Sequence, residues 1–162
     1  QYLLGRFAGL MLSVLAAVLL MAACHLLLLF AKGWHWEPFY LKALGGIYLK
    51  VLVTAALALF LALSSSSVLT ALVIAAILWT LGHFLPEIRH LIKEGAPASA
   101  ILPLTFLSYV LPDLQLFNLR DRLTMTSLSG PEAPLWAWAL YAAVYASAWL
   151  GLSRLLLRRK EF

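Results

Sequence analysis

The sequence predicts an all-α integral membrane protein that crosses the bilayer about four times, and its composition and charge distribution support this prediction. Of the 162 residues, 64% are hydrophobic and only 12% are charged. The mean hydropathy is +0.93. The charged residues occur in short islands between long uncharged tracts. A soluble domain needs charged groups over its whole surface, so this composition is typical of a protein in lipid.

The first transmembrane span is predicted at residues 7–31, which contain no Asp, Glu, Lys or Arg. At about 1.5 Å per residue this tract is long enough for a hydrocarbon core of about 30 Å. Gly33 and Pro38 follow it, together with the tryptophans Trp34 and Trp36. Such residues predict a short loop at the membrane interface.

A helical hairpin is predicted next, because residues 51–85 carry no charged side chain apart from the titratable His83. As one helix this tract would measure about 52 Å, too long for a single crossing. Four consecutive serines at residues 64–67 interrupt it, and serine favours turns and helix caps. We therefore expect a second span at about residues 39–63 and a third at about 68–85.

Residues 86–134 are predicted to form a long extramembrane connection, because charged residues occur throughout them. Ile88 and Leu91 fall on one face of a short helix whose other face is charged, the pattern of a surface helix. Residues 97–111 are uncharged but too short to span, and we expect Pro103 to break them. An interfacial or re-entrant segment is therefore expected there.

The last span is predicted at residues 135–155, between Trp136 and the basic cluster at residues 158–160. An even number of spans places both ends of the chain on the same side. Basic residues occur on both sides, so the charge distribution leaves the orientation of the chain open. One membrane domain, residues 1–162, accounts for the whole sequence.

Neither catalytic nor metal-binding residues can be assigned. Cys24 is alone, and His25, His35, His83 and His90 show no i, i+4 pairing and no accompanying carboxylate on one predicted helix, so no metal site is expected. Nucleophile and phosphate-binding motifs are absent from the sequence. The net charge of +5 comes without a basic face with interleaved aromatics, so nucleic acid is not an expected partner.

Lys50 is a candidate polar site within the membrane, and two interpretations of it remain open. If its helix begins near Pro38, Lys50 lies deep in the span and must face a protein interior or a substrate path. If the helix begins near Gly46, Lys50 is an interfacial anchor. The sequence slightly favours the anchor.

Small residues predict where helices pack closely. Gly5 and Gly9 form a GxxxG pair in the first span, and the last span has two alanine pairs with the same spacing. Small side chains allow helices to approach each other. The alanine pairs are Ala139 with Ala143 and Ala142 with Ala146.

Several stretches, in order, resemble the permease subunits of ABC-2-type transporters. Residues 1–9, QYLLGRFAG, are similar to the stretch that opens the third helix of that family, and the hairpin with its serine turn resembles the family's next two helices. Residues 107–121, LSYVLPDLQLFNLRD, are similar to its outer-loop signature, although Asp113 stands where Asn is more usual. The basic ending at residues 158–162 resembles the family's cytoplasmic C-terminus. The likeness extends to the permeases of the multicopper-enzyme maturation branch.

This resemblance implies a six-span subunit of which the four predicted spans are the third to sixth. A preceding coupling segment and two spans would then be missing upstream. The termini would be cytoplasmic in the cytoplasmic (inner) membrane, and residues 86–134 would be extracytoplasmic. Gln1, Tyr2 and Arg6 would face a partner ABC ATPase, which would bind ATP and Mg²⁺ in place of any cofactor on this chain. A second permease subunit, identical or different, would complete the transporter.

Two other classes of function compete with a permease. A membrane anchor or assembly protein would need no ATPase and would transport nothing. An intramembrane enzyme or metal carrier would require His25, His83 or Lys50 to converge on one cavity. The substrate of a transporter cannot be identified from this sequence.

Overall fold

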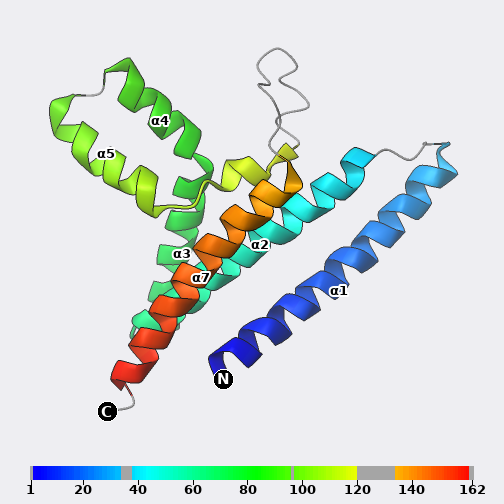
Figure 1. Ribbon diagram of the computed structural model, residues 1–162, viewed down its shortest axis with the longest axis horizontal. Coiled ribbons are helices and arrows are strands. Elements are labelled where there is room, and N and C mark those ends of the chain that lie inside the picture. The colour runs from blue at the N-terminus through cyan, green and yellow to red at the C-terminus, as the bar shows by residue number, and fades with distance from the viewer. Residues whose placement is uncertain (1, 34–37, 96, 120–133, 161–162) are drawn as a thin grey trace.

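The computed structural model describes residues 2–33, 38–95, 97–119 and 134–160, and within them the chain is helical with no strand. Four long helices form an open bundle, and two short helices project from it (Figure 1). The elements are α1 (Tyr2–Ala31), α2 (Pro38–Ser64), α3 (Val68–His83), α4 (Leu85–Glu94), α5 (Ala98–Val110), the 3₁₀ helix η1 (Leu114–Phe117) and α7 (Leu135–Lys160).

Three of the described helices, α1, α2 and α7, are long and apolar enough to cross a membrane. A fourth crossing is obtained only if α3 and α4 count as one span, and these two helices are bent by 57°. The helices are therefore those of a membrane-spanning protein, as the composition predicts.

The hairpin at the serine cluster is confirmed. The helix α2 ends at Ser64 and α3 begins at Val68, so the predicted second span is correct to within one residue at each end. The third span is shorter than predicted, because α3 ends at His83 and Phe84 joins it to α4. The physical reason is Pro86, which lies in the first turn of α4, cannot donate a backbone hydrogen bond to Gly82, and favours a helix boundary just before it.

The tightest packing in the bundle joins α2 to α7. Val53 and Ala56 on α2 and Ala142 on α7 have no exposed surface, and Ala146 is 5% exposed. One of the two predicted alanine pairs, Ala142 with Ala146, therefore lies in a helix interface. The other pair, Ala139 and Ala143, is exposed.

The helix α1 lies along α2 at the edge of the bundle (Figure 1). Phe7 and Met11 pack against Ala56 and Ala146, and near the other end of α1 the Tyr40 hydroxyl donates to the carbonyl oxygen of Ala22 at 3.2 Å. Most other side chains of α1 are exposed. In water such a surface would be unstable, so it is suited to contact with lipid or with further helices.

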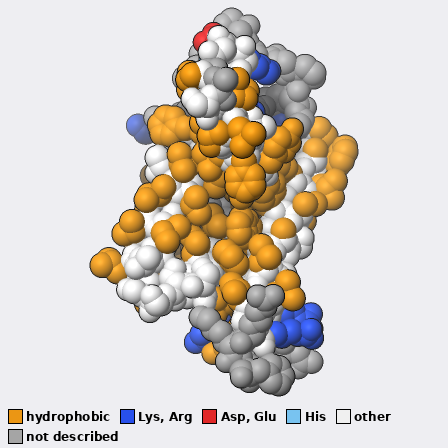
Figure 2. Space-filling view, turned by 90° about the vertical axis from the view of Figure 1, so that its left-hand side faces the viewer, with side chains coloured by type: hydrophobic (Ala, Val, Ile, Leu, Met, Phe, Trp, Pro, Cys, Tyr) orange, Lys and Arg blue, Asp and Glu red, His pale blue; other side chains and the backbone are white. Residues whose placement is uncertain are grey.

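The surface of the molecule has the polarity that a bilayer requires. Hydrophobic side chains cover the middle of the face shown in Figure 2, and Lys and Arg lie toward its two ends. The start of α1 and the end of α7 lie at the same end of the bundle (Figure 1), consistent with two chain ends on one side. Exposed residues of α1 include Leu12, Leu19, Leu20, Leu27 and Leu28, each more than half exposed.

The predicted connection at residues 86–134 is mostly helical where it is described, and residues 120–133 lie outside the described part. The predicted helix is present as α4, with Ile88 buried but Leu91 55% exposed, and its location at a membrane surface stays a prediction. Pro103 does not break the next segment, as we expected it to, because α5 runs through it. The carbonyl left without a donor there belongs to Ser99 in the exposed first turn of α5, where water can satisfy it.

Ala142→Leu is expected to destabilise the protein by about 1–3 kcal/mol, because the added side chain has no space between α2 and α7. Ala143→Leu, one residue along on the exposed side of α7, is the matched control and should change stability little. Thermal unfolding of the two variants in detergent compares them. Equal unfolding temperatures would contradict the described helix interface.

Candidate functional site

The segment at residues 111–119, here called the wedge, is inserted between the helices at one end of the bundle. It packs where α2 begins, α3 ends and α7 begins, and Leu114, Phe117 and Leu119 are each less than 5% exposed. Although it contains only one short 3₁₀ turn, it forms part of the hydrophobic core with Val53, Trp138 and other residues. These residues are therefore buried within the protein, whereas their predicted place in an extramembrane connection stays a prediction.

Two glycines allow the backbone of the wedge to approach so closely. A Cβ atom on Gly46 of α2 would lie 2.9 Å from the carbonyl oxygen of Phe117, and one on Gly82 of α3 would lie 3.0 Å from that of Pro112. Both distances are shorter than an ordinary contact, so a side chain at either position would push the wedge away. The glycines thus fix where the wedge sits.

Asp113 is the polar centre of the wedge, and its side chain is only 4% exposed. One carboxylate oxygen accepts a hydrogen bond from Arg89 Nη1 of α4 at 2.8 Å, and the other accepts one from the backbone N–H of Gln115 at 3.2 Å. The second bond caps the 3₁₀ helix in the manner of an N-cap residue. The side chain therefore joins α4 to the start of η1.

Two tyrosines of α7 bind backbone groups at Asp113 and just before it in the chain. The hydroxyl of Tyr141 accepts a hydrogen bond from the backbone N–H of Asp113 at 2.7 Å. The hydroxyl of Tyr145 lies 3.1 Å from the carbonyl oxygen of Tyr109 and 3.3 Å from that of Leu111, and donates to them. The irregular backbone of the wedge is thus held by side chains of α7 as well as by its own turn.

Burial raises the pKa of Asp113 above its usual value of 3.8. The positive charge of Arg89 and the backbone N–H groups of Gln115 and Leu116 act in the opposite direction, but burial is the larger effect. A raised pKa means that Asp113 favours the folded state most when it is protonated. Its contribution to stability is fully present below its unfolded-state value and is lost as the pH rises through its folded-state pKa.

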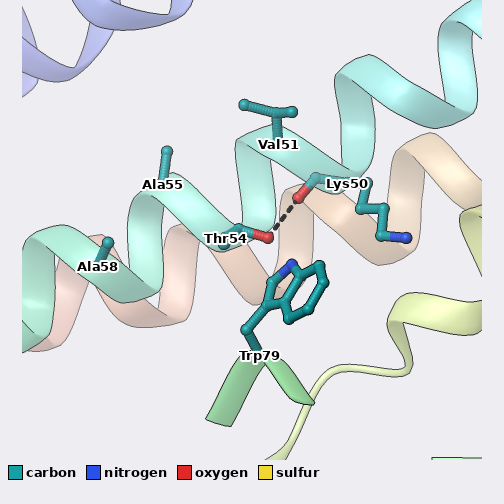
Figure 3. A pocket seen from close by; sticks show the side chains of 6 residues that line it. All are labelled: Lys50, Val51, Thr54, Ala55, Ala58 and Trp79. Carbon is teal, nitrogen blue, oxygen red and sulfur yellow. Dashed lines mark hydrogen bonds between the residues drawn. The ribbon is translucent and has the colours of Figure 1, made fainter. Parts of the chain in front are cut away.

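A second feature is an open and almost wholly apolar groove between α2 and α3 with a volume of about 420 Å³. Figure 3 shows its lining from α2, with Trp79 of α3 opposite. Thr54 donates its hydroxyl to the carbonyl oxygen of Lys50 at 2.8 Å within α2. The lining residues are Lys50, Val51, Thr54, Ala55, Ala58 and Trp79.

Lys50 lies near the middle of α2, which begins at Pro38 and not near Gly46. The interpretation of Lys50 as an interfacial anchor required the helix to begin near Gly46, and this helix start is wrong. A lysine at the centre of a spanning helix costs about 2.5–3.5 kcal/mol on insertion scales. In Figure 3 the Lys50 side chain extends away from Ala58, toward the N-terminal part of α2, the direction in which side chains on a helix lean.

The other residues predicted as sites lie at the start of α1. Gln1 is outside the described residues. Tyr2 and Arg6 are exposed, and the Arg6 guanidinium lies 5.0 Å from the centre of the Tyr2 ring. Within the described chain nothing lies within 4 Å of a Cβ built on Gly5 or Gly9, so close packing at these glycines with a further helix stays a prediction.

The three histidines that the structure describes lie on different helices and do not converge with Lys50. His25 on α1 contacts the Tyr40 ring, and the His83 ring lies against Trp79 at the end of α3. Neither lines the groove. His90 has a carboxylate partner that we did not expect, since its Nε2 lies 3.1 Å from Glu94, a pair that the i, i+4 spacing could have indicated.

Within the described residues no three His, Cys, Asp or Glu side chains are grouped so as to hold a metal ion. His35 lies outside them. The exposed Cys24 has no disulfide partner there. Among the described residues the arrangement thus offers a buried polar junction at Asp113 and an almost wholly apolar groove between α2 and α3.

No protein-family model, curated protein or solved structure matches this chain.

The sequence interpretation missed both the burial of the wedge and its link to Arg89. A signal was present, because residues 111–119 contain one charged residue among many large apolar ones. A segment of that composition is more typical of a core than of a solvated loop. The contact between Arg89 and Asp113 could not be predicted, since it depends on the bend between α3 and α4 and on the return of the chain after α5.

Arg89→Met is expected to lower stability by about 1–3 kcal/mol at about pH 8, because it leaves the Asp113 carboxylate buried without its cation. The loss should shrink toward about pH 4, since removing Arg89 raises the pKa of Asp113 further and acid protonates the carboxyl. Thermal unfolding in detergent across this pH range measures the effect.

Two further variants control this experiment. Arg89→Met combined with Asp113→Asn should recover most of the stability, since an amide keeps an acceptor for Gln115 without a buried charge. Lys93→Met removes an exposed charge from the same helix and should change little. A loss in Arg89→Met that does not depend on pH would contradict the role given to the ion pair.

Proposed function

We propose that this chain is the transmembrane part of an ABC-2-type permease subunit, which moves a substrate across the cytoplasmic membrane with energy from a partner ATPase. One observation supports this proposal above the others. The segment that resembles the family's outer-loop signature, residues 107–121, includes the wedge, and the wedge contacts α2, α3 and α4 and hydrogen-bonds to α7. A segment that contacts several helices at once is suited to couple their movements in a transporter.

The two ends of the bundle would have different tasks in such a transporter. Tyr2 and Arg6 lie at the end of the bundle where α1 starts and α7 finishes (Figure 1), and this end would face the ATPase in the cytoplasm. The wedge lies at the opposite end, where it would control the outer face. ATP and Mg²⁺ would be held by the ATPase.

Motion would pass between these ends through packed helices. Phe7 and Met11 of α1 contact Ala56 of α2 and Ala146 of α7, so a displacement of α1 acts on the tightly packed pair α2 and α7. These two helices in turn contact the wedge through Val53 and Trp138. Packed helices transmit displacement because close-packed interiors resist compression.

A second permease subunit is the further partner in this proposal. The side chains of α1 are largely exposed, and Gly5 and Gly9 on it have open space in front of them. An apolar helix with small residues at its surface can accept another helix closely. A membrane anchor or assembly protein is the competing function and would also use such a surface.

Arg6→Glu is expected to reduce the recovery of an ABC ATPase with the tagged natural protein by about tenfold, if Arg6 contributes one charged contact to that partner. Lys32→Glu makes the same charge change at the other end of α1 and should leave recovery unchanged. Affinity purification from native membranes followed by mass spectrometry measures the bound ATPase.

The same preparation separates the permease from the anchor. A permease should co-purify with an ATPase in near-equal amount and should transport nothing when reconstituted without it. Absence of any ATPase from the wild-type preparation would contradict the proposal and favour the anchor. Transport by the purified chain alone would contradict both.

A further inference from the structure

The last spanning helix provides a scale of depth for the segments that pack against it. The helix α7 begins at Leu135, is long and apolar enough to cross a membrane, and carries no charged residue before Arg154. At about 1.5 Å per residue this uncharged stretch measures about 28 Å, close to a hydrocarbon core of about 30 Å. Tyr145 stands about 15 Å from Leu135 on this scale, so it lies close to the middle of the membrane that α7 crosses.

The C-terminal end of α5 lies near the depth of Tyr145. The Tyr145 hydroxyl donates to the carbonyl oxygens of Tyr109 and Leu111 at 3.1 and 3.3 Å. Tyr109 belongs to the last turn of α5, which ends at Val110. A side chain on a helix leans toward the helix N-terminus, so the two carbonyl oxygens lie a little nearer to Leu135 than the backbone of Tyr145 does. They are still well inside the hydrocarbon layer.

From this depth the chain returns through the wedge toward the membrane edge at Leu135. The backbone N–H of Asp113 donates to the Tyr141 hydroxyl at 2.7 Å, and further along the chain the ring of Phe117 lies against the ring of Trp138. The residues of α7 that make these successive contacts are progressively nearer to the start of the helix. Between residues 109 and 117 the chain is therefore deepest at the end of α5.

The helix α5 has the composition and the surface of a segment in lipid. Residues 95–112 contain no Asp, Glu, Lys or Arg. Leu102, Phe106 and Tyr109 share one face of the helix at helical spacing, and each is more than two thirds exposed. The helix packs on α4, and Figure 1 shows it running back from the tip of this hairpin toward the bundle. In water such a face would be unfavourable, whereas hydrocarbon suits it.

We propose that α5 re-enters the bilayer, with residues 102–110 in the hydrocarbon layer, and that its face of Leu102, Phe106 and Tyr109 contacts lipid acyl chains. The sequence leaves an interfacial and a re-entrant position open for this segment, and the hydrogen bonds to Tyr145 favour the second. Lipid is the occupant because Val144, next to Tyr145, is exposed at the same depth on a helix suited to span the membrane. The proposal is independent of the proposed transport function, since an anchor protein would hold α5 in the same place.

The test is site-directed spin labelling of the protein in lipid vesicles. Cys24→Ser removes the one cysteine of this chain, and Leu102→Cys, Phe106→Cys and Tyr109→Cys are then made singly and labelled with a nitroxide. Oxygen concentrates in hydrocarbon and a nickel chelate stays in water, so the ratio of their collisions with the nitroxide measures its depth. All three labels should collide more with oxygen than with the nickel chelate.

Two reference labels calibrate the depth. Val144→Cys marks the exposed surface of α7 beside Tyr145, and the label at Tyr109→Cys should lie within about 5 Å of its depth, one helical turn. Lys93→Cys marks the exposed end of α4 and should favour the nickel chelate.

Two outcomes would overturn the proposal. A preference for the nickel chelate at any of the three α5 positions, or a depth at Tyr109→Cys closer to that of Lys93→Cys than to that of Val144→Cys, would place α5 outside the hydrocarbon layer. Weak collisions with both reagents at the α5 positions would show that protein, such as a second copy of the chain, covers the face in place of lipid. The measurement requires no ATPase, so its result does not depend on whether the chain is a permease.

Discussion

The wedge is the part of this fold that the rest depends on, because it brings irregular backbone among apolar helices. Backbone N–H and C=O groups in such a place must find partners within the protein. They do so through Tyr141 and Tyr145 of α7 and through the carboxylate of Asp113. The charge of that carboxylate is in turn balanced by Arg89 of α4. The two glycines on α2 and α3 then leave space for the backbone itself.

The remaining helices differ in how firmly they are held, and this difference has functional consequences. The pair α2 and α7 is tightly packed through fully buried small residues, whereas α1 touches the bundle through few side chains. The firmly packed pair α2 and α7 can transmit a displacement of the loosely attached α1 and keep its own structure. The groove that Lys50 and Trp79 line lies between α2 and α3.

The helices could be predicted from the sequence because hydropathy and helix breakers depend on local residues. The serine turn is an example, whereas the sequence leaves the start of α2 open between Pro38 and Gly46 and the structure places it at Pro38. The boundary between α3 and α4 falls at Phe84, close to the predicted end of the third span at residue 85, because Pro86 lies in the first turn of the new helix. The position of the wedge could not be predicted, because it results from contacts with residues at positions 46, 82, 89 and 141, far apart in the chain.

The most direct test of this account is hydrogen–deuterium exchange of the wild-type protein in detergent. Amides of residues 111–119 should exchange as slowly as those in the middle of α2, although most of the segment is not α-helical. The exposed end of α4 at residues 93–95 provides the rapid reference. Slow exchange of the wedge is the predicted result. Exchange as fast as the end of α4 would contradict the claim that a buried wedge holds the helices together.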